Sequence, residues 1–194
     1  MNLLVQLIEH LGNLICMVFM VRILLQIAQA DFNNPISQFV HKFTYPAINP
    51  LRSVIPDLGK FNTAALLIIL VVILIKLGIF HFGFGLPLNG NQLIIGTFIA
   101  YLNPGYIQLA GFISILVTLL TVLFIGLMVT SFLAGGQYNP ALMFFHQVTR
   151  PLLRPLQKII PPIGGAIDIT PMILLFVLLY LQKALMEFGL RLVQ

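Results

Sequence analysis

The stretch TRPLLRPLQKIIPPIGG, residues 149–165, places three basic residues and four prolines inside a very hydrophobic chain. It carries too much charge for a segment that crosses a bilayer, and its prolines are untypical of a helix interior. A related stretch occurs earlier: NPISQFVHKFTYPAINPLRSVIPDLG (34–59) and NPALMFFHQVTRPLLRPLQKIIPPIG (139–164) share eleven identical residues at a constant offset of 105. The sequence therefore predicts two copies of one structural unit.

Composition identifies the kind of protein that contains these copies. Of the 194 residues, 59% are hydrophobic and 8% are charged, whereas soluble domains carry about 25% charged residues. The chain is therefore expected to be an integral membrane protein. Its net charge of +5 is read as a signal of topology and of anionic lipid, not of nucleic acid. The single cysteine, Cys16, excludes an internal disulfide.

Four segments are apolar over the roughly 20 residues that a membrane-crossing helix needs. They are residues 3–28, 63–82, 106–133 and 171–192. Residues 93–101 are apolar but too short to cross, and Asn103-Pro104-Gly105 ends them with a turn signal. We interpret 93–101 as an interfacial or re-entrant piece. The expected fold class is an all-α integral membrane protein with four transmembrane helices.

The distribution of basic residues predicts the orientation, because loops on the cytoplasmic side carry an excess of Lys and Arg. The two connecting segments that carry positive charge contain Lys42, Arg52 and Lys60, and Arg150, Arg154 and Lys158. The connection 81–106 contains neither Lys nor Arg. Both basic segments are thus expected in the cytoplasm, with both termini outside. The chain divides into repeats 1–92 and 93–194, which share one orientation about a pseudo-two-fold axis along the membrane normal.

Each basic segment, 34–59 and 139–164, is predicted to be an amphipathic helical hairpin lying in the membrane interface. Asn34-Pro35 and Asn139-Pro140 are helix start signals. Apolar residues follow at i, i+3, i+4 and i+7, the stripe of an amphipathic helix: Ile36, Phe39, Val40 and Phe43, and Ala141, Phe144, Phe145 and Val148. Further residues are expected to end the first helix of each hairpin or to close the hairpin: Thr44, Pro46, Pro50, Pro56 and Gly59, and Thr149, Pro151, Pro155, Pro161 and Gly164.

Charged residues within the predicted spans are candidates for a functional site, since such residues are costly in a bilayer. Glu9 and Lys76 each lie about 9 Å from the outer end of their span, at 1.5 Å per residue. We expect them to pair; alternatively, Lys76 extends to the interface by itself. Arg22 and Gln26 lie at the other end of the first span, where Arg22 is expected to bind hairpin carbonyls, helix C-termini or Asp31. Further along, Lys183 and Glu187 are spaced to pair on one helix.

The motifs resemble those of the YggT family of small bacterial membrane proteins, which has relatives in chloroplasts. The shared pattern comprises Arg22 and Gln26, the NP, T-x-P, Pro-Leu-Arg, Ile-Pro and Gly elements, and a second-copy ending that includes Gly164, Asp168 and Pro171. Ala166 is an insertion relative to the family spacing, and the first copy has Asn62 and Ala65 in place of Asp168 and Pro171. The resemblance implies the bacterial inner membrane as location. It also implies roles in osmotic shock tolerance, in division or nucleoid organisation or, in chloroplasts, in haem attachment to a cytochrome b complex.

Catalytic and metal-binding motifs are absent from the sequence. There is no HExxH, CxxC, GxSxG, P-loop or dinucleotide fingerprint, so we expect neither an enzyme nor a bound cofactor. His41 and His146 occupy matching positions in the two copies. We interpret them as polar-face residues of interfacial helices; the alternative is a pair of haem or metal ligands.

Three hypotheses for the function follow, in order of preference. The first is a non-enzymatic platform on the cytoplasmic face that binds anionic lipid headgroups and partner proteins, through the six basic residues of the two hairpins. The second is a small transporter or channel that acts in osmotic balance. The third is a cofactor assembly factor. The expected partners are the lipid bilayer and an unidentified protein, a homo-oligomer is a further option, and nucleic acid is not expected.

Overall fold

The computed structural model of the chain describes residues 2–31, 33–86, 88, 91–101, 105–134, 138–160 and 168–191. Within these ranges there are six α-helices, α1 (Asn2–Ile27), α2 (Pro35–Arg52), α3 (Thr63–Gly78), α4 (Phe112–Ala134), α5 (Pro140–Gln157) and α6 (Thr170–Arg191). A π-helix, η1 (Ile79–Gly83), extends α3, and two strands, β1 (Gly96–Tyr101) and β2 (Gly105–Ala110), precede α4.

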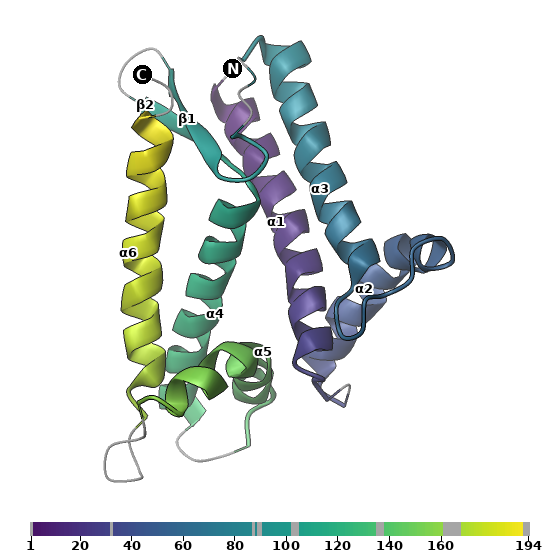
Figure 1. The fold of residues 1–194 in the computed structure, drawn as a ribbon, viewed down its shortest axis with the longest axis vertical. Coiled ribbons are helices and arrows are strands. Elements are labelled where there is room, and N and C mark those ends of the chain that lie inside the picture. The colour runs from purple at the N-terminus through teal and green to yellow at the C-terminus, as the bar shows by residue number, and fades with distance from the viewer. Residues whose placement is uncertain are drawn as a thin grey trace.

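Helices α1, α3, α4 and α6 run lengthwise through the molecule, and α2 and α5 lie across one end of it (Figure 1). Helix α1 packs against α3, and α4 packs against α6. Helices α2 and α5 lie at one end, whereas α1 begins and α6 finishes toward the other end (Figure 1). Three helical segments are long and apolar enough to cross a membrane, namely Leu3–Ile27, Thr63–Gly83 and Phe112–Leu133. The apolar part of α6, Thr170–Leu185, is shorter, so a fourth span stays a prediction.

The packing is that of a protein whose outer surface is apolar. A core cluster that includes Cys16, Phe19 and Ile69 joins α1 and α3 with α2, α4 and α5, and a second cluster that includes Phe124 and Leu153 joins α4, α5 and α6. Large apolar side chains also cover the outside of the helices, for example Phe132 at 84% exposure. Such surfaces suit contact with lipid, which supports a membrane protein.

The start signals of the two crosswise helices act at matching positions. The Asn34 side chain accepts a hydrogen bond from the Ile36 amide at 2.9 Å, and that of Asn139 accepts one from the Ala141 amide at 2.9 Å. Pro35 and Pro140 each occupy the first turn, where a missing amide proton costs nothing. These local features recur 105 residues apart; the division into repeats 1–92 and 93–194 stays a prediction.

The expected hairpins are instead continuous helices, which corrects the sequence prediction. Helix α2 includes Pro46 and Pro50, and α5 includes Pro151 and Pro155. The two prolines of each helix are four residues apart and therefore remove amide protons on one face. The carbonyls that lose their partners belong to residues four positions earlier, Lys42, Pro46, Gln147 and Pro151, and none of these residues is buried. Helix formation consequently continues through the prolines.

The apolar stripe predicted for the first crosswise helix also differs from the buried face. Val40 of α2 is buried, together with Ser37, Thr44 and Ile48. Phe39 and Phe43, which the pattern assigned to the same stripe, are 65% and 57% exposed. The Thr44 hydroxyl donates to the Val40 carbonyl at 2.8 Å, which explains how a polar side chain is accommodated on the buried face.

A second correction concerns the connection before α4. Strands β1 and β2 pair antiparallel, with Gly96 opposite Ala110 and Tyr101 opposite Gly105. The piece 93–101 is therefore partly a strand, and the span predicted at 106–133 begins only at Phe112. Short apolar runs rich in β-branched and aromatic residues form strands as readily as helices, and a short Gly-containing turn between two such runs is a hairpin signal. The chain is thus predominantly helical and not wholly α.

Residues that close the crosswise segments lie partly outside the described part of the chain. Gly59 has a φ of +61°, a left-handed conformation that glycine adopts without the steric cost of a Cβ. Pro161 and Gly164 fall outside the described residues, as do the loop residues 102–104 and the last residue of the predicted span 171–192.

Candidate functional site

A buried ion pair joins the first two long helices. Lys76 of α3 places its Nζ 3.0 Å from Oε2 of Glu9 on α1, and both side chains are at most 5% exposed. Nζ also donates to Glu9 Oε1 at 3.1 Å, to Asn13 Oδ1 at 2.8 Å and to the Ala110 carbonyl at 2.8 Å. The ammonium therefore uses all three of its protons. The pairing expected from the sequence is present, and at 2% exposure Lys76 does not extend to the surface.

The surroundings hold this ion-pair network in place. Glu9 Oε1 also accepts hydrogen bonds from the Asn13 side chain at 2.9 Å and from the Ala110 amide at 2.7 Å. A Cβ at Gly12 would lie 3.1 Å from Lys76 Cδ, so a glycine there lets the lysine pass close to α1. The network consequently ties α1, α3 and the end of β2 together. The several hydrogen bonds that hold Lys76 and Glu9 indicate a structural role.

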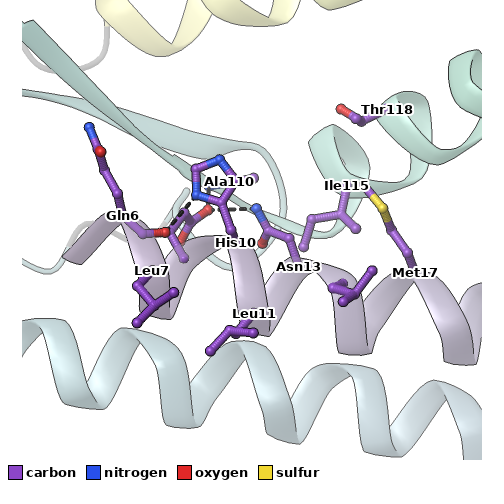
Figure 2. Close-up of a pocket in the computed structure, with 11 residues that line it drawn as sticks. Gln6, Leu7, His10, Leu11, Asn13, Met17, Ala110, Ile115 and Thr118 are labelled. Atoms are coloured by element: carbon purple, nitrogen blue, oxygen red, sulfur yellow. Dashed lines mark hydrogen bonds between the residues drawn. The ribbon is translucent and has the colours of Figure 1, made fainter. Parts of the chain in front are cut away.

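A cavity of about 600 Å³ lies beside this network, between α1 and α4. Figure 2 shows His10 and Asn13 on α1 and Thr118 on α4 among its lining residues. In the second half of the chain, Gln182 Nε2 donates to Thr118 Oγ1 at 3.5 Å. Thr118 follows Asn13 by 105 residues, and Gln182 follows Lys76 by 106 residues. At these offset positions the second half therefore has an uncharged contact where the first half has the Lys76–Asn13 hydrogen bond.

Lys183 and Glu187 lie elsewhere on α6 and do not form the pair that their spacing allows. Both residues are exposed. The ion pairs between described residues are Lys76–Glu9 and Arg52–Asp57. A contribution of Lys183 or Glu187 to an intramembrane site therefore has no support from the geometry.

A second pocket, of about 460 Å³, lies where the end of α1 meets α2. We call it the arginine pocket. It is lined by Arg22, Leu25, Gln26, Gln29, Ala30, His41 and Arg52. Arg22 is 5% exposed, whereas the Arg52 side chain is 37% exposed. The pocket thus contains one deep and one shallow guanidinium group, and no acidic residue is among those that line it.

A hydrogen-bond network fixes the shallow side of the arginine pocket. Arg52 forms an ion pair with Asp57 and donates to Gln26 Oε1 at 3.3 Å. Gln26 donates to Asp57 Oδ2 at 3.1 Å and accepts from Asn62 Nδ2 at 2.9 Å. Asn62 in turn caps α3 by accepting the Ala65 amide at 2.8 Å. The side chains of Arg52 and Gln26 are therefore held in position before any ligand arrives.

Another pocket, of about 560 Å³, lies where α4, α5 and the start of α6 meet. Leu127, Ser131 and His146 line it at positions 105 residues after Arg22, Gln26 and His41. We call it the leucine pocket. The two histidines thus line separate pockets, which gives no support to a shared haem or metal site. Among the described residues, no group of three or more His, Cys, Asp or Glu side chains is placed to hold a metal ion.

Asp168, which also lines the leucine pocket, has partners that resemble those of Asp57. Gln157, which is 105 residues after Arg52, donates to Asp168 Oδ2 at 2.6 Å. The Thr170 amide donates to Oδ1 at 2.9 Å. Burial raises the pKa of Asp168, but the hydrogen bonds from Thr170 and Gln157 outweigh it and lower the pKa below its usual value. Asp168 therefore acts as an anionic cap before α6.

All six basic residues expected to bind lipid or partners are exposed. They are Lys42, Arg52, Lys60, Arg150, Arg154 and Lys158. The sequence reasoning did not single out Asp57, Gln157 or Gln182 as site residues. The repeat offset is the sequence signal that identifies two of them. Gln157 lies 105 residues after Arg52, and Gln182 lies 106 residues after Lys76.

The arrangement defines a small helical membrane protein with polar networks at both ends of its helices and no catalytic constellation in its described part. The family model described as CCB3/YggT matches residues 1–82 and 106–189, and the chain belongs to this family. It is 35% identical over 190 residues to the Escherichia coli K12 protein named "Uncharacterized protein YggT", covering 96% of this chain and 91% of that one. It is 34% identical over 175 residues to an uncharacterized Haemophilus influenzae protein, covering 90% and 87%. No solved structure matches the chain.

Proposed function

We propose that this protein is a non-enzymatic platform in the bacterial inner membrane, and that the end formed by α2 and α5 binds anionic lipid headgroups and a partner protein on the cytoplasmic face. The observation that carries the proposal is the position of the exposed basic residues. Lys42 lies on α2, Arg150 and Arg154 lie on α5, and both helices cross the same end of the molecule (Figure 1). Basic residues near an anionic leaflet contribute about 1 kcal/mol each to surface attraction.

The exposed aromatic residues of α2 support an interfacial position for this helix. Phe39 and Phe43 are exposed and stack with ring centroids 6.1 Å apart. A helix with apolar groups on one side and basic groups on another is suited to the boundary between acyl chains and headgroups. Four spans with both termini outside complete the proposal, since this topology brings α2 and α5 to the cytoplasmic leaflet.

The connection to osmotic stress tolerance or to envelope and division organisation is a further part of the proposal. A platform that gathers anionic lipid and a partner at one face can act in such processes without catalysis. Transport is less favoured, because the polar groups of the ion-pair network are engaged with one another and with Ala110. A cofactor assembly role is less favoured because His41 and His146 line separate pockets.

The test uses the absence of tryptophan from the chain. Phe43→Trp introduces the only tryptophan of the chain beside the basic surface. In vesicles that mix brominated phosphatidylglycerol with phosphatidylcholine, we expect stronger quenching than when the same fraction of bromine is on phosphatidylcholine, and a smaller difference at high salt. Replacing Lys42, Arg150, Arg154 and Lys158 by Gln should remove the difference. Lys183→Gln, on α6, is the control. Equal quenching by both lipids in the Phe43→Trp protein would refute the lipid platform.

A further inference from the structure

We propose that the arginine pocket is a binding site for a terminal phosphate group, either the phosphate monoester of a lipid headgroup or free inorganic phosphate. The inference deepens the proposed function, because it assigns a ligand class to one specific site within the platform. Its physical basis is the convergence of two guanidinium groups, Arg22 and Arg52, with amide and imidazole groups in one cavity of about 460 Å³. Arginine presents planar, paired donors that match the oxygens of a phosphate.

The charge of the site favours an anion. Two arginines line it, and the carboxylate that engages Arg52 belongs to Asp57. Two positive charges and one negative charge leave an excess of one positive charge around the cavity. Burial, followed by the charges of Arg22 and Arg52, holds the pKa of His41 below its usual value. His41 therefore contributes a neutral imidazole, and an arriving phosphate meets polar groups that are already in position.

The leucine pocket shows that the fold does not need arginines at this place. Leu127 stands 105 residues after Arg22, and Gln157 stands 105 residues after Arg52. Gln157 keeps the hydrogen bond to a carboxylate that Arg52 makes in the first half. A leucine and a glutamine thus satisfy the matching structural positions of the same chain. Arg22 and Arg52 thus give the arginine pocket two guanidinium groups that the leucine pocket does not have, and such groups favour an anionic ligand.

In the proposed topology the arginine pocket lies near the cytoplasmic end of α1, where lipid headgroups are expected. Arg22 is five residues before the end of α1 at Ile27, which corresponds to about 7.5 Å along the helix at 1.5 Å per residue. Residues of α1 and α2 line the cavity, and α2 crosses one end of the molecule (Figure 1). A lipid whose phosphate reaches Arg22 and Arg52 could leave its acyl chains along the apolar surface of the helices.

The experiment measures binding to the full-length protein in detergent by its thermal shift. The probes are dioctanoyl phosphatidic acid, which carries a phosphate monoester, dioctanoyl phosphatidylglycerol, which carries a diester, and inorganic phosphate. We expect phosphatidic acid to raise Tm at lower concentration than phosphatidylglycerol. Two variants, Arg22→Leu and Arg52→Gln, introduce the residues found at the matching positions of the second half. Each variant should lower the affinity for phosphatidic acid at least tenfold, because it removes one charge-assisted hydrogen bond.

Further variants distinguish recognition of phosphate by the two arginines from a loss of folding and from a change in net charge. Arg22→Lys keeps the charge and loses the paired donors, so its affinity should lie between wild type and Arg22→Leu. Lys183→Gln removes one positive charge on α6 and should bind as wild type does. Arg52→Gln retains a hydrogen-bonding side chain beside Asp57, which guards against a result caused by unfolding of Arg22→Leu. Unliganded Tm values near that of wild type show that a variant is folded.

The outcomes distinguish the sources of the phosphate. A shift with phosphatidic acid that the arginine variants lose assigns the site to a lipid headgroup. A shift with inorganic phosphate alone, lost in the same variants, assigns it to free phosphate. Binding that is unchanged in folded Arg52→Gln and Arg22→Leu proteins, or no shift with either phosphatidic acid or inorganic phosphate, overturns the inference. Equal quenching in the Phe43→Trp experiment would refute the platform and leave this site standing, because the two measurements use different probes and different residues.

Discussion

Lys76 and Glu9 form a buried ion pair across two helices, with Nζ 3.0 Å from Oε2 and side-chain exposures of 2% and 5%. The two residues are 67 positions apart in the chain. Their contact fixes how far α3 is shifted along α1, because each charge needs the other at the same depth. The Ala110 amide and carbonyl extend the contact to the end of β2. One pair of charges thus positions three elements.

The first prediction concerns this pair. Glu9→Gln or Lys76→Met leaves the other charge buried without its partner, which costs about 3–5 kcal/mol of folding free energy. The double variant should recover part of the loss, because neither charge remains buried. Unfolding in detergent, monitored by helical circular dichroism, measures the four proteins. Gln182→Leu is the control: it removes one 3.5 Å contact in the second half and should cost less than about 1 kcal/mol. A double variant whose loss equals the sum of the single losses would mean that the two residues act independently.

The second prediction compares the two helix caps. Asn34 caps α2 and also donates from Nδ2 to the Pro140 carbonyl at 2.7 Å, whereas Asn139 caps α5. Either Asn→Ala change should cost about 1 kcal/mol for the lost cap. Asn34→Ala should cost about 1 kcal/mol more than Asn139→Ala, since it also removes a hydrogen bond between the two crosswise helices. Equal losses in the two variants would show that the contact with Pro140 contributes nothing.

The long helices could be predicted from the sequence because their signal is unambiguous. Thr63–Gly83 contains one charged residue in 21 positions, and an apolar run of that length has few alternatives to a helix. The depth of Glu9 and Lys76 followed from the same helices at a fixed rise per residue. Register along a regular helix is therefore recoverable from the sequence wherever both partners lie within regular elements.

The sequence predictions that the structure corrects are those in which a local signal conflicts with the surrounding structure. Pro46 and Pro151 are strong helix breakers in isolation, yet the segments that contain them stay helical where they lie across the end of the molecule. The run 93–101 is short and apolar, which leaves helix and strand equally open. The partner of Arg52 was missed because Asp57 lies beyond the end of the helix, where a chain reversal and not a periodic spacing sets the contact.

The third prediction tests the topology. In a Cys16→Ser background, single cysteines at Lys60 and Lys158 should react with a membrane-impermeant maleimide only after the membrane is opened. A cysteine at Leu88, which is 51% exposed, should react from outside in intact cells. The result follows from the excess of basic residues in the two connecting segments. Labelling of Leu88→Cys only after the membrane is opened, with labelling of Lys60→Cys in intact cells, would reverse the orientation.

The fourth prediction concerns the pH dependence that His41 gives to stability. Burial and the charges of Arg22 and Arg52 lower the pKa of His41 in the folded protein below its ordinary value of 6.5. The unfolded chain therefore binds a proton near pH 6.5 that the folded chain does not yet bind. Stability falls as the pH drops through 6.5 toward the folded pKa, and below that pKa it falls no further. His41→Gln removes this effect.

The measurement compares the unfolding free energy of wild type and His41→Gln between pH 8 and pH 5. We expect the unfolding free energy of His41→Gln to rise relative to that of wild type as the pH falls. In an Arg22→Leu background the gain should shrink, because one of the two positive charges that disfavour the imidazolium is gone. The neutral imidazole also connects this prediction to the arginine pocket: a bound phosphate would favour a protonated His41, so saturating phosphatidic acid should reduce the same pH-dependent difference. Curves for wild type and His41→Gln that stay parallel from pH 8 to pH 5 would show that His41 does not experience the charges of the pocket.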